Sequence, residues 1–318
     1  MAFPAVSATS KKCQPDTVWQ ILAEGVWYSK PEGVLLKKVS PMAQPEIDPE
    51  MLPFVAPCRK LTLDHPLDWL KRGWNDFRQA PRPSLLYGGF LVLLSYILGF
   101  FTWKLGGYVL IFSLMSGFVF IAPILAIGLY SISCQLQHGL KPQIGYCLRE
   151  GRRHLGSEMV YSMILLVIFL LWARAGSMTH VFFPIEARPH IGDLTVFLAV
   201  GTAVGTVFAT LVFCASAFSL PMMLDRKVDT VTAVLTSVNA VLNNKAVMAL
   251  WALFIVLALL ICFATAFLGL AVLMPVIGYA TWHAYQDTIM ADDWPKHKPT
   301  FQTPGADSAD ELSKGITG

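Results

Sequence analysis

Charged residues are scarce in this sequence. They make up 14% of its 318 residues, whereas ordinary soluble proteins carry about 25%. Hydrophobic residues make up 55%, and the mean hydropathy is +0.55. From Ala246 to Thr281 there is no charged residue at all. This composition excludes an ordinary soluble domain and indicates a protein that resides in a lipid bilayer.

The lack of paired cysteines, of a signal sequence and of membrane histidines limits the sites that this protein can form. The six cysteines form no C-x-x-C pair and no ligand-like spacing, which argues against a disulfide framework or a zinc site. No secretory signal is predicted, because the first thirty residues lack an apolar core behind a basic start. Only His283 falls on a predicted membrane helix, and one helical histidine cannot make a bis-histidine haem. We therefore expect no cofactor and no metal.

Apolar runs predict an all-α fold of six transmembrane helices, arranged as three hairpins. As one helix, the uncharged stretch would outreach a ~30 Å hydrocarbon core at ~1.5 Å per residue, so we expect a break at Thr265 to Gly269. The cores of the predicted spans hold no ionisable residue, which argues against a proton-coupled transporter. The six predicted spans are at about residues 84–103, 108–133, 158–175, 194–222, 246–264 and 267–287.

A short amphipathic helix is predicted before each hairpin. In the first, Leu63 to Ala80, the residues Leu67, Leu70, Trp74 and Phe77 fall on one helical face. The second lies within residues 135–157, and the third runs from Thr230 to Asn243. Helices of this profile lie in the membrane interface. The recurrence of segment plus hairpin suggests a triplicated unit.

The segments outside this 58–290 transmembrane domain differ in composition. Prolines interrupt residues 1–57 except for a short helical stretch, Thr17 to Tyr28, so we expect a Pro-rich, disordered tail. Met42 and Met51 are both alternative starts, which raises the expectation that the N-terminus is overextended. Residues 291–318 are polar, and we expect a disordered cytoplasmic tail there.

The basic residues predict the orientation. They gather before the first span, between the second and third, and between the fourth and fifth. The opposite side holds only Lys104, Arg174 and Arg188. By the positive-inside rule this bias places both termini in the cytoplasm.

The best local candidate for a site is Trp282-His283-Ala284-Tyr285, with Asp287 four residues after the histidine. A histidine and a carboxylate at that spacing share a helix face and can form a proton-linked pair. Tryptophan and tyrosine are also enriched at the membrane boundary, so an aromatic belt is the alternative. An enzyme at the interface would need these side chains to converge on one cavity with Asp225 and Arg226.

The fourth predicted span carries a stripe of small residues, Gly201, Gly205 and Ala209. Small residues at every fourth position let helix backbones approach closely. We expect this stripe to serve helix packing, and a solute path is the alternative.

Several segments together form a recognisable pattern: Leu52–Arg59, Trp69–Phe77, Ala80–Pro81, Ser84–Gly88, Gly128–Tyr130, Pro221–Arg226, Thr232–Ala233 with Ser237, and Gly278–Tyr285. This pattern, over about Leu52 to Ile289, resembles a bacterial inner-membrane family known as domain of unknown function 2189. Some members carry the label of a cytochrome c oxidase subunit. The resemblance implies a multi-pass inner-membrane protein and supplies no catalytic residues.

The sequence favours a non-enzymatic membrane protein: a scaffold or assembly partner, or a carrier of a lipid-like or neutral solute. The alternative is an accessory subunit of a respiratory cytochrome oxidase, without haem or copper ligands of its own. Expected partners are membrane lipids, with a homo-oligomer or a membrane-protein complex left open, and no nucleic acid. No catalytic, cofactor-binding or metal-ligating residue is predicted.

Overall fold

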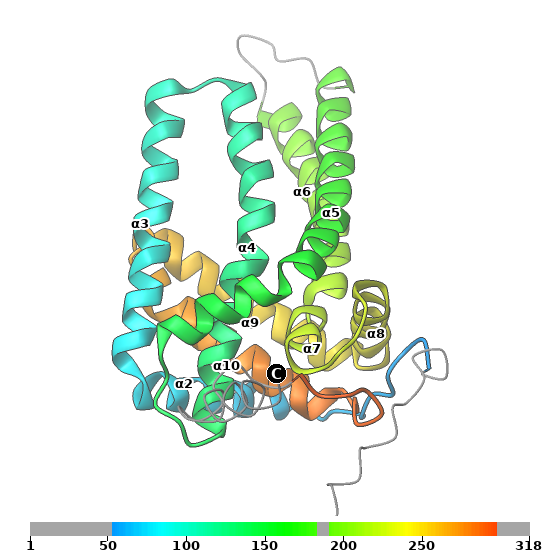
Figure 1. Ribbon diagram of the computed structural model, residues 1–318. Coiled ribbons are helices and arrows are strands. Elements are labelled where there is room, and N and C mark those ends of the chain that lie inside the picture. Colours follow the sequence, from blue (N-terminus) through cyan, green and yellow to red (C-terminus); the bar gives the residue numbers. More distant parts are fainter. Residues whose placement is uncertain (1–52, 183–190, 298–318) are drawn as a thin grey trace, which may run out of the picture. The chain divides into compact units, whose positions relative to one another are not determined.

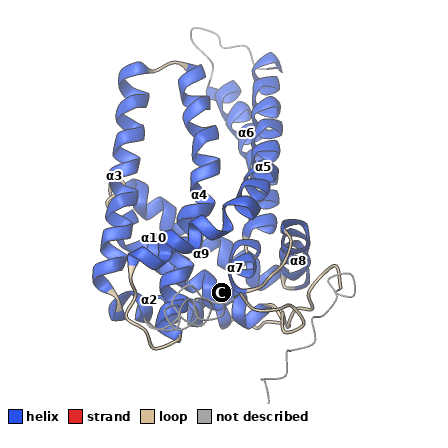
Figure 2. Cartoon of the chain, in the orientation of Figure 1, coloured by secondary structure: helices blue, strands red, loops and turns tan. Residues whose placement is uncertain are grey.

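The computed structural model describes residues 53–182 and 191–297. The predicted helix Thr17 to Tyr28 lies outside these ranges, as does most of the C-terminal tail. The described chain is helical throughout (Figure 2), which confirms the all-α prediction. Its helices are α2 (His65–Gln79), α3 (Pro81–Leu105), α4 (Tyr108–Gln137), α5 (Ile144–Phe182), α6 (Ile191–Ser216), α7 (Ser219–Asp225), α8 (Thr230–Asn243), α9 (Lys245–Ala264) and α10 (Leu270–Thr288).

Five stretches of the described chain are long and apolar enough to cross a membrane. Helix α10 is not among them, because its last turns are polar. Figure 1 shows α3, α4, α5 and α6 rising from one end, which we call the base, where α2, α7 and α8 lie. The five stretches are Pro81–Leu105, Leu114–Gln137, Leu155–Met178, Thr195–Asp225 and Lys245–Ala264.

Helix α10 is packed into the base through glycines on its neighbours. A Cβ on Gly73 of α2 would come within 2.6 Å of the Val276 carbonyl oxygen and 2.8 Å of the Ala280 nitrogen. A Cβ on Gly88 of α3 would collide with the backbone of Ala271. Only glycine permits backbones to approach this closely. The core beside these crossings consists of Phe77, Ala80, Leu129, Ile132, Cys147, Val276 and Tyr279.

The turn between α9 and α10 confirms the predicted break, since α9 ends at Ala264 and α10 begins at Leu270. Ala266 and Phe267 have φ angles of 49° and 67°, a left-handed conformation that side chains disfavour. The Tyr96 hydroxyl of α3 donates a hydrogen bond to the Ala266 carbonyl at 2.7 Å. This bond fixes the turn against the middle of α3 rather than its end.

Two predicted boundaries differ from the structure. The amphipathic segment within 135–157 and the third span join into one helix, α5, because no proline separates them after Ile144 and the glycines there do not end the helix. The fourth predicted span is not one continuous helix: α6 ends at Ser216, and α7 begins at Ser219. At that break the Phe218 N–H donates to the Ser237 hydroxyl at 3.1 Å. Pro221 falls in the first turn of α7, where its missing N–H costs little.

The buried faces of the amphipathic helices differ from the predicted apolar faces. On α2 the predicted apolar face is only partly covered: Phe77 is buried, but Leu67 and Trp74 are 48% and 47% exposed. The buried face also carries Trp69, Gly73 and Asp76, and the close contact with α10 requires the glycine. Helix α8 has the predicted bounds, and it likewise exposes its leucines. Its buried residues are Thr230, Thr232, Ala233, Thr236, Ser237, Ala240 and Val241.

Both ends of the described chain pair at the base. The Arg59 N–H donates to the Thr288 carbonyl at 2.8 Å, and the Met290 N–H donates to the Pro57 carbonyl at 2.9 Å. Ala56 and Trp294 are buried there. The residues nearest the domain, 53–57 and 291–297, are therefore anchored, although the sequence assigned them to tails.

Candidate functional site at the end of α10

The last two turns of α10 carry polar side chains into the interior. Trp282, His283 and Tyr285 are almost fully buried, and Asp287 is partly exposed. These four residues are the α10 members of the cluster predicted from the sequence. Their side chains contact three different helices: α2, α4 and α7.

His283 meets a carboxylate of α2. Its Nε2 lies 2.8 Å from Oδ2 of Asp76, and both side chains are more than nine-tenths buried. The Ser133 hydroxyl of α4 donates to the same Asp76 oxygen at 2.5 Å. Because the serine bonds to the carboxylate and not to the imidazole, this trio lacks the contact between nucleophile and base that activates a hydroxyl.

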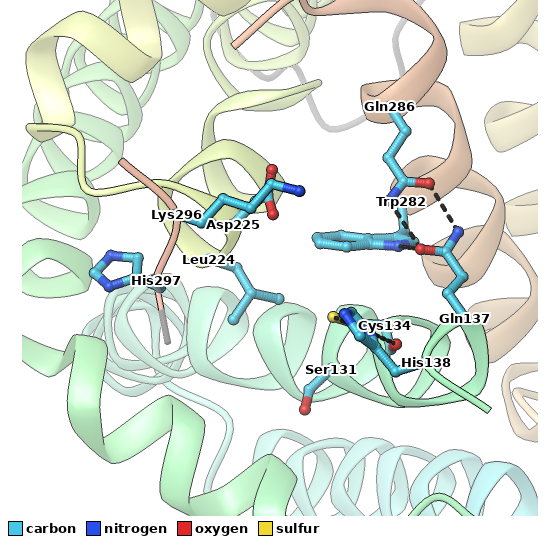
Figure 3. Close-up of a pocket in the computed structure, with 10 residues that line it drawn as sticks. All are labelled: Ser131, Cys134, Gln137, His138, Leu224, Asp225, Trp282, Gln286, Lys296 and His297. Atoms are coloured by element: carbon cyan, nitrogen blue, oxygen red, sulfur yellow. Dashed lines mark hydrogen bonds between the residues drawn. The ribbon is translucent and has the colours of Figure 1, made fainter. Parts of the chain in front are cut away.

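Gln137 at the end of α4 completes this network. Its Oε1 accepts from Trp282 Nε1 at 3.0 Å, and its Nε2 lies 3.3 Å from His283 Nδ1. The same amide exchanges hydrogen bonds with Gln286 at 2.7 and 2.8 Å, as Figure 3 shows. Asp76, Ser133 and Gln137 were not predicted as site residues. For Asp76 the sequence did hold a signal, because this carboxylate lies between Gly73 and Phe77 on the same helix.

Tyr285 meets the predicted pair Asp225 and Arg226. Its hydroxyl and Arg226 Nε both donate to Oδ2 of Asp225, each at 2.9 Å. Arg226 Nη1 also donates to the Trp294 carbonyl at 2.9 Å. Burial lowers the pKa of Arg226, but the hydrogen bond and charge of Asp225 outweigh it and raise that pKa above its ordinary value.

Asp287 turns to α2. It accepts from the Arg72 guanidinium, with Nη1 at 3.3 Å from Oδ1, and from Trp69 Nε1 at 2.9 Å. Burial alone would raise the pKa of Asp287. The hydrogen bonds from Arg72 and Trp69 lower this pKa by more than burial raises it, so the pKa lies below its ordinary value. The pairing of His283 with Asp287 that their spacing suggested does not form, since each has another partner.

A cavity of about 140 Å³ lies between the ends of α4, α7 and α10 and the segment that follows α10. Figure 3 shows the Trp282 ring and Asp225 beside it. Of the predicted cluster, only Trp282 and Asp225 line this cavity. Asp287 lines a different hollow, with Arg59, Lys60 and Arg72. The cluster therefore does not converge on a single cavity.

Two other predictions concern the long helices. A Cβ on Gly201 or Gly205 would meet no atom within 4 Å in the described chain, so packing through the Gly201–Gly205–Ala209 stripe stays a prediction. The prediction that the cores of the spans hold no ionisable residue stays a prediction. Glu158 lies near the start of the membrane-length stretch Leu155–Met178 of α5, as the sequence predicted, and its side chain is 2% exposed.

Long apolar helices that expose most of their side chains define an integral, multi-pass membrane protein. A family model described as "Predicted integral membrane protein (DUF2189)" matches residues 110–225, which confirms the resemblance noted from the sequence. No curated protein and no solved structure matches the chain. Within the described residues, His, Cys, Asp and Glu form no group of three that could hold a metal ion.

Proposed function

We propose that this chain is a non-enzymatic scaffold or assembly partner of a bacterial inner membrane. One observation carries the proposal: the ionisable groups at the end of α10 pair with groups on other helices instead of lining one cavity. His283 joins Asp76, Tyr285 joins Asp225, and Asp287 joins Arg72. Three cross-links of this kind fix α10 to α2 and α7, which suits a rigid base.

The size of the cavity at the base supports a scaffold more than a carrier. Its volume of about 140 Å³ is below the ~300–1,000 Å³ typical of small-molecule sites. The Trp282 ring and Leu224 line it together with amides and with the charged side chains of Asp225 and Lys296. Such a lining suits a few waters more than an apolar solute, so a carrier of a lipid-like or neutral solute is only our second candidate.

The exposed apolar surface of the long helices also supports a scaffold or assembly partner. Helix α3 presents Phe90, Leu93 and Phe100, and α6 presents Leu198 and Leu211, all at least half exposed. In a bilayer such side chains contact lipid tails or another membrane protein. The apolar sides of α2 and α8, which the chain also leaves uncovered, suit the interface next to them.

We further propose six membrane-embedded helices arranged as three hairpins, with both termini in the cytoplasm. The pairing of the two described ends at the base supports an even number of crossings, and the basic residues support the cytoplasmic side. In this arrangement α10 accompanies α9 into the membrane, and its polar last turns remain at the base.

Native mass spectrometry of the protein, extracted from its own membrane with mild detergent, tests the function. We expect a homo-oligomer or a complex with another membrane protein. If the chain carries only a tightly held neutral solute, the carrier is favoured over the scaffold.

A co-purifying respiratory oxidase subunit would favour the alternative, an accessory subunit whose haem and copper belong to its partners. A monomer that turns over a substrate in the same preparation would contradict a non-enzymatic role.

A further inference from the structure

Glu158 is a buried ionisable group without a hydrogen-bond partner in the described chain. Its side chain is 2% exposed, and both of its carboxyl oxygens lack a hydrogen-bond partner. It lies on α5 within the membrane-length stretch Leu155–Met178. No Lys, Arg or His among the described residues pairs with it. A bare carboxylate in such a place is strongly disfavoured, because nothing replaces its lost hydration.

The side chains that the structure describes around Glu158 are neutral. Tyr87 of α3 approaches it, but the Tyr87 hydroxyl already donates to the Leu125 carbonyl at 2.6 Å. One turn along α5, the fully buried Tyr161 lies beside Tyr130 of α4. From α8, the Thr230 hydroxyl donates to the Ser157 carbonyl at 3.2 Å. None of these groups supplies a positive charge.

The surroundings of Tyr161 extend the same polar region toward α6 and α7. Its hydroxyl lies next to those of Ser216 and Ser219, without a hydrogen bond of ordinary geometry to either. Both serine hydroxyls donate to their own helix, at the Val212 and Ala215 carbonyls. The interior thus holds a carboxyl and a phenol on one face of α5, next to hydroxyls that can accept or pass on a proton.

We propose that Glu158 is a proton-binding site in the interior of the bundle, where α5 leaves the base. The proton is the ligand of its carboxyl, which ionises as the pH rises or when the bundle opens. This goes beyond a scaffold role, because it gives the bundle a group whose charge can change with conformation.

Infrared difference spectroscopy of the full chain in lipid nanodiscs tests the proposal. We expect the carbonyl band of a protonated carboxylic acid at neutral pH and its complete loss in Glu158→Gln. Asp68→Asn is the matched control, because Asp68 is exposed and paired with Lys71, and it should leave the band unchanged. Glu158→Asp should keep an acid band at a shifted frequency.

A second readout separates protonation from a folding defect. Glu158→Gln is an isostere of the neutral acid, so its apparent Tm at neutral pH should equal that of the wild type. At alkaline pH the wild type should fall below the variant, because only the wild type acquires a buried charge. If the wild type lacks the acid band at neutral pH, the proposal is wrong. If sodium ions abolish the band, the resting ligand is a metal cation, which also overturns it.

Discussion

The buried pair of Asp76 and His283 holds α2 and α4 to α10. Removing one member of a buried pair typically costs about 3–5 kcal/mol, because the other is left without its partner. We expect Asp76→Ala and His283→Ala each to destabilise the protein by that amount. The double variant should lose clearly less than the sum of the two, since the pair is removed together. Thermal unfolding in one detergent measures all four proteins.

The control for this cycle is Asp68→Ala, which removes an exposed ion pair with Lys71. Exposed pairs contribute about 0–1 kcal/mol, so this variant should unfold close to the wild type. Additive losses for Asp76 and His283 would show that their contact at 2.8 Å contributes no coupling energy.

Asp287 gives the base a pH dependence. It lies outside the five membrane-length stretches, and its pKa is held below the ordinary value by Arg72 and Trp69. A carboxylate whose pKa is lower in the folded state stabilises the fold above its unfolded pKa, and it loses that stabilisation as the pH falls. The apparent Tm should therefore decline as the pH falls from about 4. Asp287→Asn should lower the Tm at neutral pH and weaken the decline. A decline of equal size in both proteins would assign it to other groups.

At the scale of elements, two adjacent glycines of α3 offer a matched test of helix packing. A methyl group on Gly88 would collide with the backbone of Ala271, whereas one on Gly89 would meet nothing within 4 Å. Gly88→Ala should separate α3 from α10 and cost about 1–3 kcal/mol, as overpacking does. Gly89→Ala should be neutral or stabilising, because alanine favours a helix by about 1 kcal/mol. Equal Tm values for the two variants would contradict the close approach of α3 and α10.

Much of this element order could be predicted from the sequence, because uncharged runs of membrane length leave few alternatives. The start of α8 is an example: Asp229 caps it by accepting from the Thr232 N–H at 2.9 Å. The join inside α5 could not be predicted, since hydropathy changes there although no residue breaks the helix. The partners of His283 and Asp287 could not be predicted from the sequence either. They come from α2, more than two hundred residues away in the sequence, and periodicity within α10 carries no information about them.

At the scale of the whole molecule, the even number of crossings has a direct test. A reporter enzyme that is active only in the periplasm should be inactive when fused after Asp287, and active when fused after Gly107 in the turn between α3 and α4. The reason is that the two described ends pair at the base, while the α3–α4 turn lies at the far end of both helices (Figure 1). Activity after Asp287 would mean an odd number of crossings and would overturn the hairpin arrangement.

The depth of the last hairpin is a separate question, because a shallow and a full hairpin return the chain to the same side. The Ala266 carbonyl contacts Tyr96, which lies nine residues before the last residue of α3. At 1.5 Å per residue, the turn therefore ends about 14 Å short of the end of α3, within a ~30 Å hydrocarbon core. In a background without native cysteines, a membrane-impermeant maleimide should label Gly107→Cys readily and Ala266→Cys hardly at all. Equal labelling of both would show that α9 and α10 cross completely, and that α10 is a full transmembrane helix despite its polar last turns.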